Sequence, residues 1–305
     1  MSNNDVIITP NPEYRKKLLD QQRARMGIGT RREGVHVSDL IMCVRKSWAE
    51  RQTDYIMEPP DHTVLTWLRG LSHEDLLSDG VTQVRGGYCF RCQRIQIPSP
   101  QYLEHVCSEC GDTLLTGTID WIQLTSDDGT NLTNFVPTEM KSTLKSARKT
   151  LDDMAWYVDQ IKSYMAIWGR DLGHVAVFHI MGDYKREDKD VKTDGPTADL
   201  KTYDIEWRDP TARINWLSPL EGRKRALEDD KHMPPLDTSS PAHPMICNYC
   251  AVGERLPNGN ECEKWPWKRL SDGQYVLKGS QKAVKSMDEM MEEVKALSEG
   301  GILKT

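Results

Sequence analysis

The sequence predicts a mixed α/β fold, in which helices flank a central mixed sheet and a small cysteine-rich ribbon is inserted. The chain has 305 residues and 38% hydrophobic residues, enough to bury one sizeable core with a small attachment. Strand-like and amphipathic helical segments alternate in the middle of the chain, which is typical of α/β folds. Eight cysteines fall into spaced groups, which indicates metal centres within this fold.

The N-terminal part, residues 1–85, is predicted to be helical. One helix is expected over residues 11–26, because a proline stands near its start and a glycine follows its end. Ser38 is expected to cap a second helix over residues 39–51. A third is expected over residues 63–78, where apolar residues recur at helical spacing.

The charge distribution restricts where a polyanion could bind. The net charge is −6, which excludes a uniformly basic surface for nucleic acid. Residues 15–51, however, carry ten lysines and arginines against four acidic residues. We therefore expect any contact with a polyanion to be local, with this stretch as the candidate.

Two pairs of cysteines, separated by fourteen residues, predict a zinc ribbon over residues 86–112. Two residues between thiolates allow a tight turn to direct both sulfurs at one ion, and the second pair completes a tetrahedral site. Gly111 suits such a turn, which often requires a positive φ. Two unrelated pairs or a redox motif are the alternatives. The expected zinc ligands are Cys89, Cys92, Cys107 and Cys110.

The other four cysteines are Cys43 and the C-terminal group Cys247, Cys250 and Cys262. Spacing alone leaves two interpretations open. The four thiolates could hold a four-iron cluster. Alternatively, the three C-terminal cysteines and a histidine such as His243 could form a second zinc site, with Cys43 a buried apolar residue.

The core is predicted over residues 113–233. Two strands joined by a turn form a hairpin, a long amphipathic helix follows, and two more strands lead into another helix. The expected strands are 114–124, 134–142, 174–181 and 201–207, with turns or loops at 126–129 and 184–199, and the expected helices are 147–169 and 210–230.

The C-terminal part divides into a cysteine segment, 234–270, and a tail, 271–305. A proline-rich link leads into the cysteine segment. In the tail, residues 281–298 are expected to form a helix that docks on its own domain. Beside the last cysteine, Trp265, Trp267 and Lys268 could stack against a nucleic-acid strand, but packing in the core is the preferred interpretation.

Two carboxylates and a lysine are expected to converge in the predicted hairpin. Glu139 and Lys141 are two residues apart in one strand, so they lie on the same face, and Asp120 on the neighbouring strand can face them. Adjacent carboxylates are stabilised by a divalent cation, and a lysine beside them can orient a water or stabilise developing charge. Metal-dependent phosphodiester hydrolysis needs this set of groups. Alternating Glu and Lys on a solvated strand face is the alternative.

Three further residues are candidates on the helices. His73 could add an imidazole ligand, although a lone histidine is more often structural. Gln160 and Tyr164 are four residues apart, so they project from one helix face and could contact the substrate, or simply form a half-exposed flank.

The order His73, Asp120, Glu139-x-Lys141, Gln160-x3-Tyr164 resembles the RecB-like branch of the PD-(D/E)xK nucleases. The segment HVSDLIMCVRKSW and the later CNYC…C resemble the cysteine motifs of its iron–sulfur members, above all the Cas-four exonucleases of CRISPR adaptation modules. The resemblance covers roughly residues 36–270. The gap from Cys250 to Cys262 is longer than usual in that family, and the ribbon is an addition.

The resemblance implies a restriction-endonuclease-like core and assigns roles to the candidate residues. Asp120, Glu139, His73 and the Met140 carbonyl would bind Mg²⁺ or Mn²⁺, Lys141 would be catalytic, and Gln160 and Tyr164 would position the substrate. A 4Fe-4S cluster would be bound by Cys43, Cys247, Cys250 and Cys262.

The expected function is therefore that of a metal-dependent DNA nuclease, an exonuclease that prefers single strands or frayed ends. The resemblance implies a role in CRISPR spacer processing beside an integrase, or in recombination and repair beside a helicase. A non-catalytic DNA-binding or scaffold subunit, stapled by zinc and an iron–sulfur cluster, is the alternative. Because no secretory signal or long apolar run is present, we expect a cytoplasmic protein without membrane contact.

Overall fold

A computed structural model gives the structure of the chain. It describes fourteen stretches of residues: 11–26, 33–53, 59, 61–77, 84–96, 105–124, 135–145, 147, 149–180, 198–236, 247, 250, 252–269 and 275–278. The predicted turn at 126–129, most of the predicted loop at 184–199 and the predicted helix at 281–298 lie outside these residues.

The first and third predicted helices are confirmed as α1 (Pro12–Arg25) and α4 (Asp61–Leu77), whereas the second is wrong. It is two helices, α2 (Val37–Ile41) and α3 (Val44–Gln52). The backbone leaves helical geometry at the residue before α3, where Cys43 has φ −125° and ψ 104°. The break makes Cys43 the N-cap residue that precedes a new helix rather than a position inside one.

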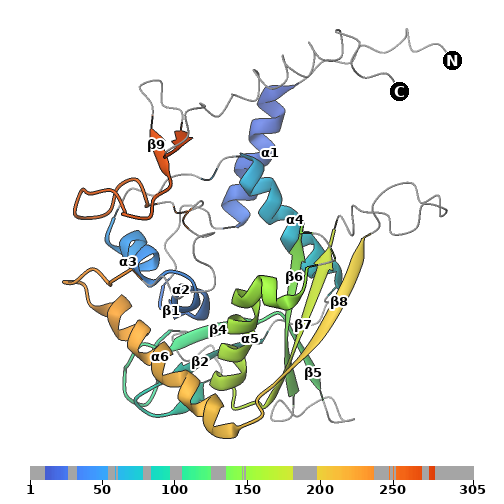
Figure 1. The fold of residues 1–305 in the computed structure, drawn as a ribbon, viewed down its shortest axis with the longest axis vertical. Coiled ribbons are helices and arrows are strands. Elements are labelled where there is room, and N and C mark those ends of the chain that lie inside the picture. The colour runs from blue at the N-terminus through green and yellow to red at the C-terminus, as the bar shows by residue number, and fades with distance from the viewer. Residues whose placement is uncertain are drawn as a thin grey trace, which may run out of the picture.

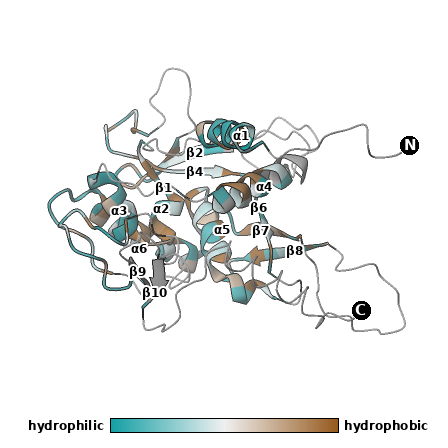
Figure 2. Cartoon of the chain, turned by 90° about the horizontal axis from the view of Figure 1, so that it is seen from above, coloured by the Kyte–Doolittle hydropathy of each residue, from teal (hydrophilic) through white to brown (hydrophobic). Residues whose placement is uncertain are grey.

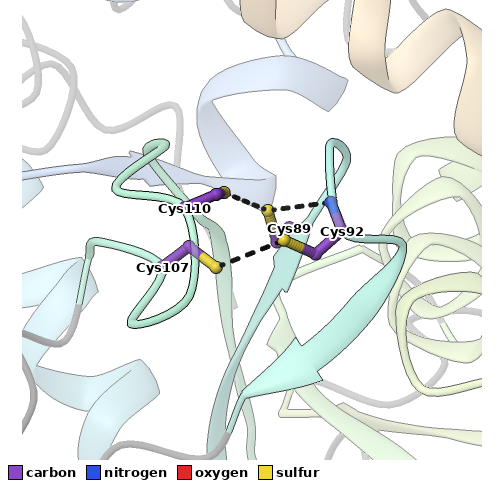
Figure 3. A group of neighbouring side chains, drawn as sticks. All are labelled: Cys89, Cys92, Cys107 and Cys110. Carbon is purple, nitrogen blue, oxygen red and sulfur yellow. Dashed lines mark hydrogen bonds between the residues drawn. The ribbon is translucent and has the colours of Figure 1, made fainter.

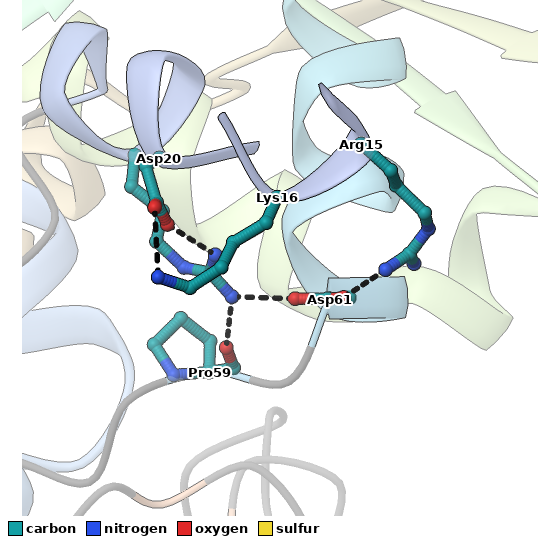
Figure 4. Close-up of polar contacts among 6 residues, drawn as sticks. Arg15, Lys16, Asp20, Pro59 and Asp61 are labelled. Atoms are coloured by element: carbon teal, nitrogen blue, oxygen red, sulfur yellow. Dashed lines mark hydrogen bonds and ion pairs between the residues drawn. The ribbon is translucent and has the colours of Figure 1, made fainter. Parts of the chain in front are cut away.

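Helix α1 is attached to α4 by charge rather than by an apolar face. It is hydrophilic along its length (Figure 2), and Leu19 is its buried residue. Arg15 and Arg23 both bind the Asp61 carboxylate at the start of α4, at 2.6 and 2.7 Å, while Lys16 lies 3.7 Å from Asp20 (Figure 4).

The strands form two mixed four-stranded sheets in the described residues, where one central sheet was expected. The predicted strand 114–124 bends at Asp120 and contributes to both (Figure 1). The first sheet has the order β1 (Val35–His36), β4 (Leu115–Ile119), β2 (Val84–Cys89), β3 (Arg94–Gln96). The second has the order β5 (Trp121–Leu124), β6 (Phe135–Thr143), β7 (Leu172–His179), β8 (Asp199–Glu206).

Pairing in the second sheet fixes the surroundings of the predicted carboxylate–lysine group. Strands β5 and β6 are antiparallel, which confirms the predicted hairpin, and Trp121 lies opposite Thr138. Strand β7 is parallel to β6, and β8 returns antiparallel to β7. The crossover from β6 to β7 is made by α5, as expected for a parallel pair.

The long helix predicted over 147–169 begins later than expected. A 3-10 turn, η2 (Leu151–Met154), precedes α5 (Ala155–Ile167). Figure 1 places α5 between the two sheets. On one side Gly173 of β7 admits Ile161 and Met165 to close contact, and on the other Gly117 of β4 admits the Tyr164 ring.

The remaining described elements close the core. Helix α6 (Pro210–Glu228) was predicted and contacts both α5 and α3. Strands β9 (Trp267–Arg269) and β10 (Tyr275–Leu277) form a small antiparallel pair after the cysteine segment. Trp265 is 4% exposed, which confirms core packing for this ring. None of the described helices combines the length and the apolarity needed to span a membrane.

Replacing Gly117 by alanine tests the packing that places α5. The added Cβ would lie 2.7 Å from the Tyr164 ring, so the variant should lose about 1–3 kcal/mol in free energy of unfolding. Gly222 of α6 is the matched control, because a Cβ there meets nothing within 4 Å and alanine is the better helix former. Urea denaturation measures both; equal stability of the Gly117→Ala variant and the wild type would contradict the packing.

Candidate active site and metal centres

Asp120, Glu139 and Lys141 meet where the first sheet bends into the second. The β5–β6 register brings Asp120, the residue before β5, opposite Glu139. Asp120 Oδ2 accepts a hydrogen bond from the Met140 N–H at 2.9 Å, which fixes its carboxylate against β6. Lys141 Nζ contacts Glu139 Oε1 and lies 4.0 Å from Asp120 Oδ2. The three groups predicted from the sequence are therefore within reach of one another.

Burial strengthens the electrostatic interactions among Asp120, Glu139 and Lys141. Glu139 is 0% exposed and Asp120 is 8% exposed, so water screens their charges poorly. Burial disfavours the ammonium of Lys141, but the charges of Glu139 and Asp120 outweigh it and raise the pKa of Lys141. The lysine is thus held as a cation beside two carboxylates, and its side chain is 24% exposed.

Helix α5 covers this group with polar and aromatic side chains. Gln160 Nε2 donates a hydrogen bond to the Tyr164 hydroxyl at 3.0 Å, so the predicted pair is together. Burial and the Glu139 charge raise the pKa of Tyr164, which keeps it a neutral phenol able to donate a hydrogen bond. Tyr157, which the sequence analysis missed, has its ring centroid 5.9 Å from Lys141 Nζ.

Two further metal ligands were predicted, and of these His73 does not join the two carboxylates in one close group, whereas Met140 lies in the same strand as Glu139 and Lys141. His73 packs edge-on against Phe178 of β7, with ring centroids 4.9 Å apart. Its Nδ1 is buried without a hydrogen-bond partner among the described residues. The ligand atoms of His73, Asp120 and Glu139 do not all lie within 4.8 Å of one another. Met140 lies between Glu139 and Lys141 in β6 and is 8% exposed.

The ribbon cysteines form a compact four-thiol site (Figure 3). Their sulfurs all lie within 4.8 Å of one another, with Cys89 Sγ 3.5 Å from Cys110 Sγ and Cys107 Sγ 3.8 Å from Cys92 Sγ. A tetrahedral ion with bonds of about 2.3 Å to sulfur separates its ligands by about 3.8 Å. These four cysteines could therefore bind one metal ion.

Both turns of the ribbon use a left-handed residue directly after their second cysteine. Gly111 has φ +76°, as predicted, and the equivalent Gln93 has φ +53°. The turns direct backbone N–H groups at sulfur, as when the Cys92 N–H points at Cys89 Sγ at 3.3 Å. Burial opposes ionisation of Cys107, but the N–H groups of Cys110 and Glu109 prevail and lower its pKa to about 7.

Metal binding at the ribbon should depend on pH in a defined direction. The neighbouring Cys110 thiol and burial raise the pKa of Cys92, and burial raises that of Cys89, so binding must displace protons from these thiols. We expect about one tightly bound zinc per chain and an affinity that falls as pH is lowered through 7. Competition with a coloured zinc chelator measures this; a pH-independent affinity would contradict thiolate ligation. Cys92→Ser should lose the ion, and Ser108→Ala, in the same ribbon, should keep it.

The second cysteine group lines one cavity, although its members are far apart in sequence. Cys43 reaches it from the start of α3, while Cys247, Cys250 and Cys262 reach it from the C-terminal segment. Burial, with a further contribution from the charges of Cys43 and Cys262, raises the pKa of Cys247. The cavity also receives Arg45 and Lys46, two positive side chains that follow Cys43.

The two cysteine groups differ in spacing. Among the described residues, the ribbon alone brings three or more ligand atoms within 4.8 Å of one another. A four-iron cube binds each thiolate at a different iron, so its ligands stand further apart than those of a single ion. The four cysteines of the second cavity are more widely spaced than those of the ribbon, as the ligands of a larger group would be.

Six basic residues of the stretch predicted to contact a polyanion form ion pairs in the described part of the chain. Within it, Arg45 binds Glu263 at 2.7 Å, Lys46 binds Glu50 at 2.8 Å and Arg51 lies 3.2 Å from Asp39. The paired basic residues among those described are Arg15, Lys16, Arg23, Arg45, Lys46 and Arg51. Some of these pairs lie within one helix, as at Lys46 and Glu50, and others join separate segments, as at Arg45 and Glu263.

Comparison with known proteins gives no relative: no family model, no curated protein and no solved structure matches the chain. The function must therefore be inferred from the arrangement of the side chains.

Proposed function

We propose that this protein is a metal-dependent nuclease that hydrolyses DNA phosphodiester bonds, with Asp120, Glu139 and Lys141 as its active site. The observation that supports this most directly is the convergence of the three side chains at the bend between the sheets, with Lys141 Nζ against Glu139 and 4.0 Å from Asp120. The order of motifs that resembles the RecB-like nucleases, His73 included, supports the same proposal.

The donor set suits a hard cation. Two buried carboxylates from adjacent strands provide the oxygen ligands that Mg²⁺ and Mn²⁺ prefer, and their mutual repulsion would be relieved by a divalent charge. Asp120 and Glu139 would hold the ion, which supplies Lewis acidity and a bound water of lowered pKa. The backbone N–H of Met140 orients the Asp120 carboxylate for this role.

Lys141 acts in this proposal as a fixed positive charge rather than as a base. Its ammonium, which lies beside both carboxylates, would stabilise the negative charge that develops on the phosphate oxygens during attack. Tyr164, neutral and hydrogen-bonded by Gln160, can donate to a non-bridging phosphate oxygen. Tyr157 lies over Lys141 and limits its movement.

We further propose that the ribbon holds zinc and that the second cavity holds a 4Fe-4S cluster on Cys43, Cys247, Cys250 and Cys262. The short sulfur distances support a single ion in the ribbon, and the wider spacing of the four cysteines that line the second cavity supports a cluster there. A cluster there would join α3 to a segment some two hundred residues later and would brace the fold next to α6.

The proposal is tested by cleavage of labelled single-stranded DNA after removal and return of divalent metal. We expect cleavage with Mn²⁺ or Mg²⁺ and none after chelation, while Ca²⁺ should permit binding without turnover. Binding without cleavage in any metal would instead favour a non-catalytic DNA-binding subunit.

A further inference from the structure

The described residues of the loop that follows β6, among them Lys145 and Ala147, are attached to the second sheet next to Lys141. The Lys145 N–H donates to Thr143 Oγ1 at 3.1 Å, and its carbonyl lies 3.0 Å from Nδ1 of the buried His179. Further along the loop, Lys201 Nζ of β8 donates to the Ala147 carbonyl. Side chains carried by this loop or bound to it are therefore held in place relative to the active site.

Lys201 lies level with Lys141 across the second sheet, two strands away. In the strand registers Lys141 pairs with Val177, and Val177 pairs with Lys201. Residues paired in this way point to the same face, and neighbouring strands are about 4.8 Å apart, so the two lysines are about 10 Å apart at the backbone. Lys201 therefore lies on the face of the sheet that carries the proposed catalytic lysine.

Lys145 is linked to Lys141 through two aromatic rings. Lys145 Nζ is 4.6 Å from the Trp156 ring centroid, and the Trp156 and Tyr157 rings are 5.2 Å apart. Tyr157 in turn lies next to Lys141. The ammonium of Lys145 also donates to the Asp153 carbonyl at 3.2 Å. The rings and this carbonyl hold Lys145 close to the active site.

These two lysines differ from the basic residues of the N-terminal stretch in what they bind. Lys145 and Lys201 donate to backbone carbonyls, and within the described residues neither forms an ion pair. Their ammonium groups are thus positioned by carbonyls rather than by close ion pairs, and the carboxylate of Asp153 lies near enough to Lys145 to interact with its charge. In contrast, Arg15 and Arg23 are committed to Asp61.

We propose that Lys145 and Lys201 bind two phosphates of a single DNA strand on one side of the scissile bond. This inference rests on the proposed function and names the surface that carries the substrate. A single strand is favoured because half-buried Tyr157, between Lys141 and Lys145, offers a ring on which one base can stack, and positive grooves with aromatic side chains are how proteins hold unpaired strands.

The test is binding of a short labelled single-stranded deoxyoligonucleotide in Ca²⁺ over a range of salt concentrations. Lys145→Gln and Lys201→Gln should each weaken binding about tenfold and lower the slope of log affinity against log salt by about 0.7, the value for one contact to single-stranded phosphate. Lys145→Arg and Lys201→Arg should retain most of the affinity. Lys16→Gln on α1 is the control and should change neither quantity.

Protection of lysines in the wild-type protein provides a test without variants. Acetylation by acetic anhydride, read by mass spectrometry, should be slowed at Lys145 and Lys201 by the oligonucleotide and unchanged at Lys16. Unprotected lysines, glutamine variants that bind as the wild type does, or a wild type that binds no single strand would each overturn the inference. A wild type that binds the strand through both lysines but never cleaves it would overturn the nuclease proposal alone.

Discussion

Replacing Lys141 by methionine should lower the rate of DNA cleavage by about a hundredfold to a thousandfold while leaving binding of the strand in Ca²⁺ almost unchanged. The ammonium of Lys141 contacts Glu139 and lies 4.0 Å from the Asp120 carboxylate, and its charge would stabilise the transition state more than the ground state. Loss of one such electrostatic group typically costs a factor of about 10²–10³ in turnover. Single-turnover cleavage and a binding titration separate the two effects.

The same experiment needs a control for charge and for folding. Lys16→Met removes one positive charge from an exposed side chain on α1 and should cleave at the wild-type rate. Lys141→Arg keeps the charge but not the compact ammonium, so we expect it to remain far below wild type. If Lys141→Met cleaves as fast as the wild type, the group at the sheet bend is not the active site.

Cys43→Ala should lose the iron of the cluster and much of the stability of the protein. A cluster that ties Cys43 to the C-terminal cysteines closes a loop of about two hundred residues, and a cross-link of that length stabilises by about 4–5 kcal/mol in the chain-entropy model. Iron content per folded chain and the urea midpoint measure the two effects. Zinc in the ribbon should remain at about one per chain.

Val44→Ala is the matched control for this variant. Val44 is 5% exposed and follows Cys43 directly, so its truncation removes buried apolar contacts without removing a sulfur. It should lower stability and keep the iron. Full iron content and unchanged stability in Cys43→Ala would show that Cys43 is not a ligand. Cys43 would then be a buried apolar residue, as in the alternative interpretation of the sequence.

Periodicity predicted most elements but missed three interruptions, which are the break at Cys43, the late start of α5 and the bend at Asp120. The apolar spacing of Val37, Leu40, Ile41, Val44 and Trp48 continues across the break at Cys43, so no pattern marks it. The start of η2, which precedes α5, was detectable. The Thr150 N–H donates to Asp153 Oδ2 at 3.1 Å, and a threonine followed three residues later by an acidic residue is a signal for a helix start.

The bend at Asp120 could not be predicted, because it depends on contacts distant in sequence. One β-rich segment was read as one strand, but its first half pairs with β1 and β2 and its second half with β6. Local residue preferences contain no information on which partners a strand finds. The bend matters for the site, since it leaves Asp120 between two sheets and facing Glu139.

Spacing predicted the candidate site better than it predicted the fold around it. Period-two alternation placed Glu139 and Lys141 together, and four-residue spacing placed Gln160 beside Tyr164. Tyr157 was missed although it precedes Gln160 by three residues and shares its helix face. Lys145, which follows β6, and Lys201 of β8 left no sequence signal, because the groups that anchor them are backbone carbonyls.

The central claim is that Asp120 and Glu139 bind the divalent ion that makes this protein a nuclease. The most direct measurement is Mn²⁺ binding to wild type and to Asp120→Asn by calorimetry, run beside cleavage of labelled single-stranded DNA with the same samples. We predict that the wild type binds Mn²⁺ and cleaves, whereas Asp120→Asn, which is of the same size but uncharged, binds Mn²⁺ at least about tenfold more weakly and does not cleave detectably. Equal Mn²⁺ binding and equal cleavage by the two proteins would contradict the claim.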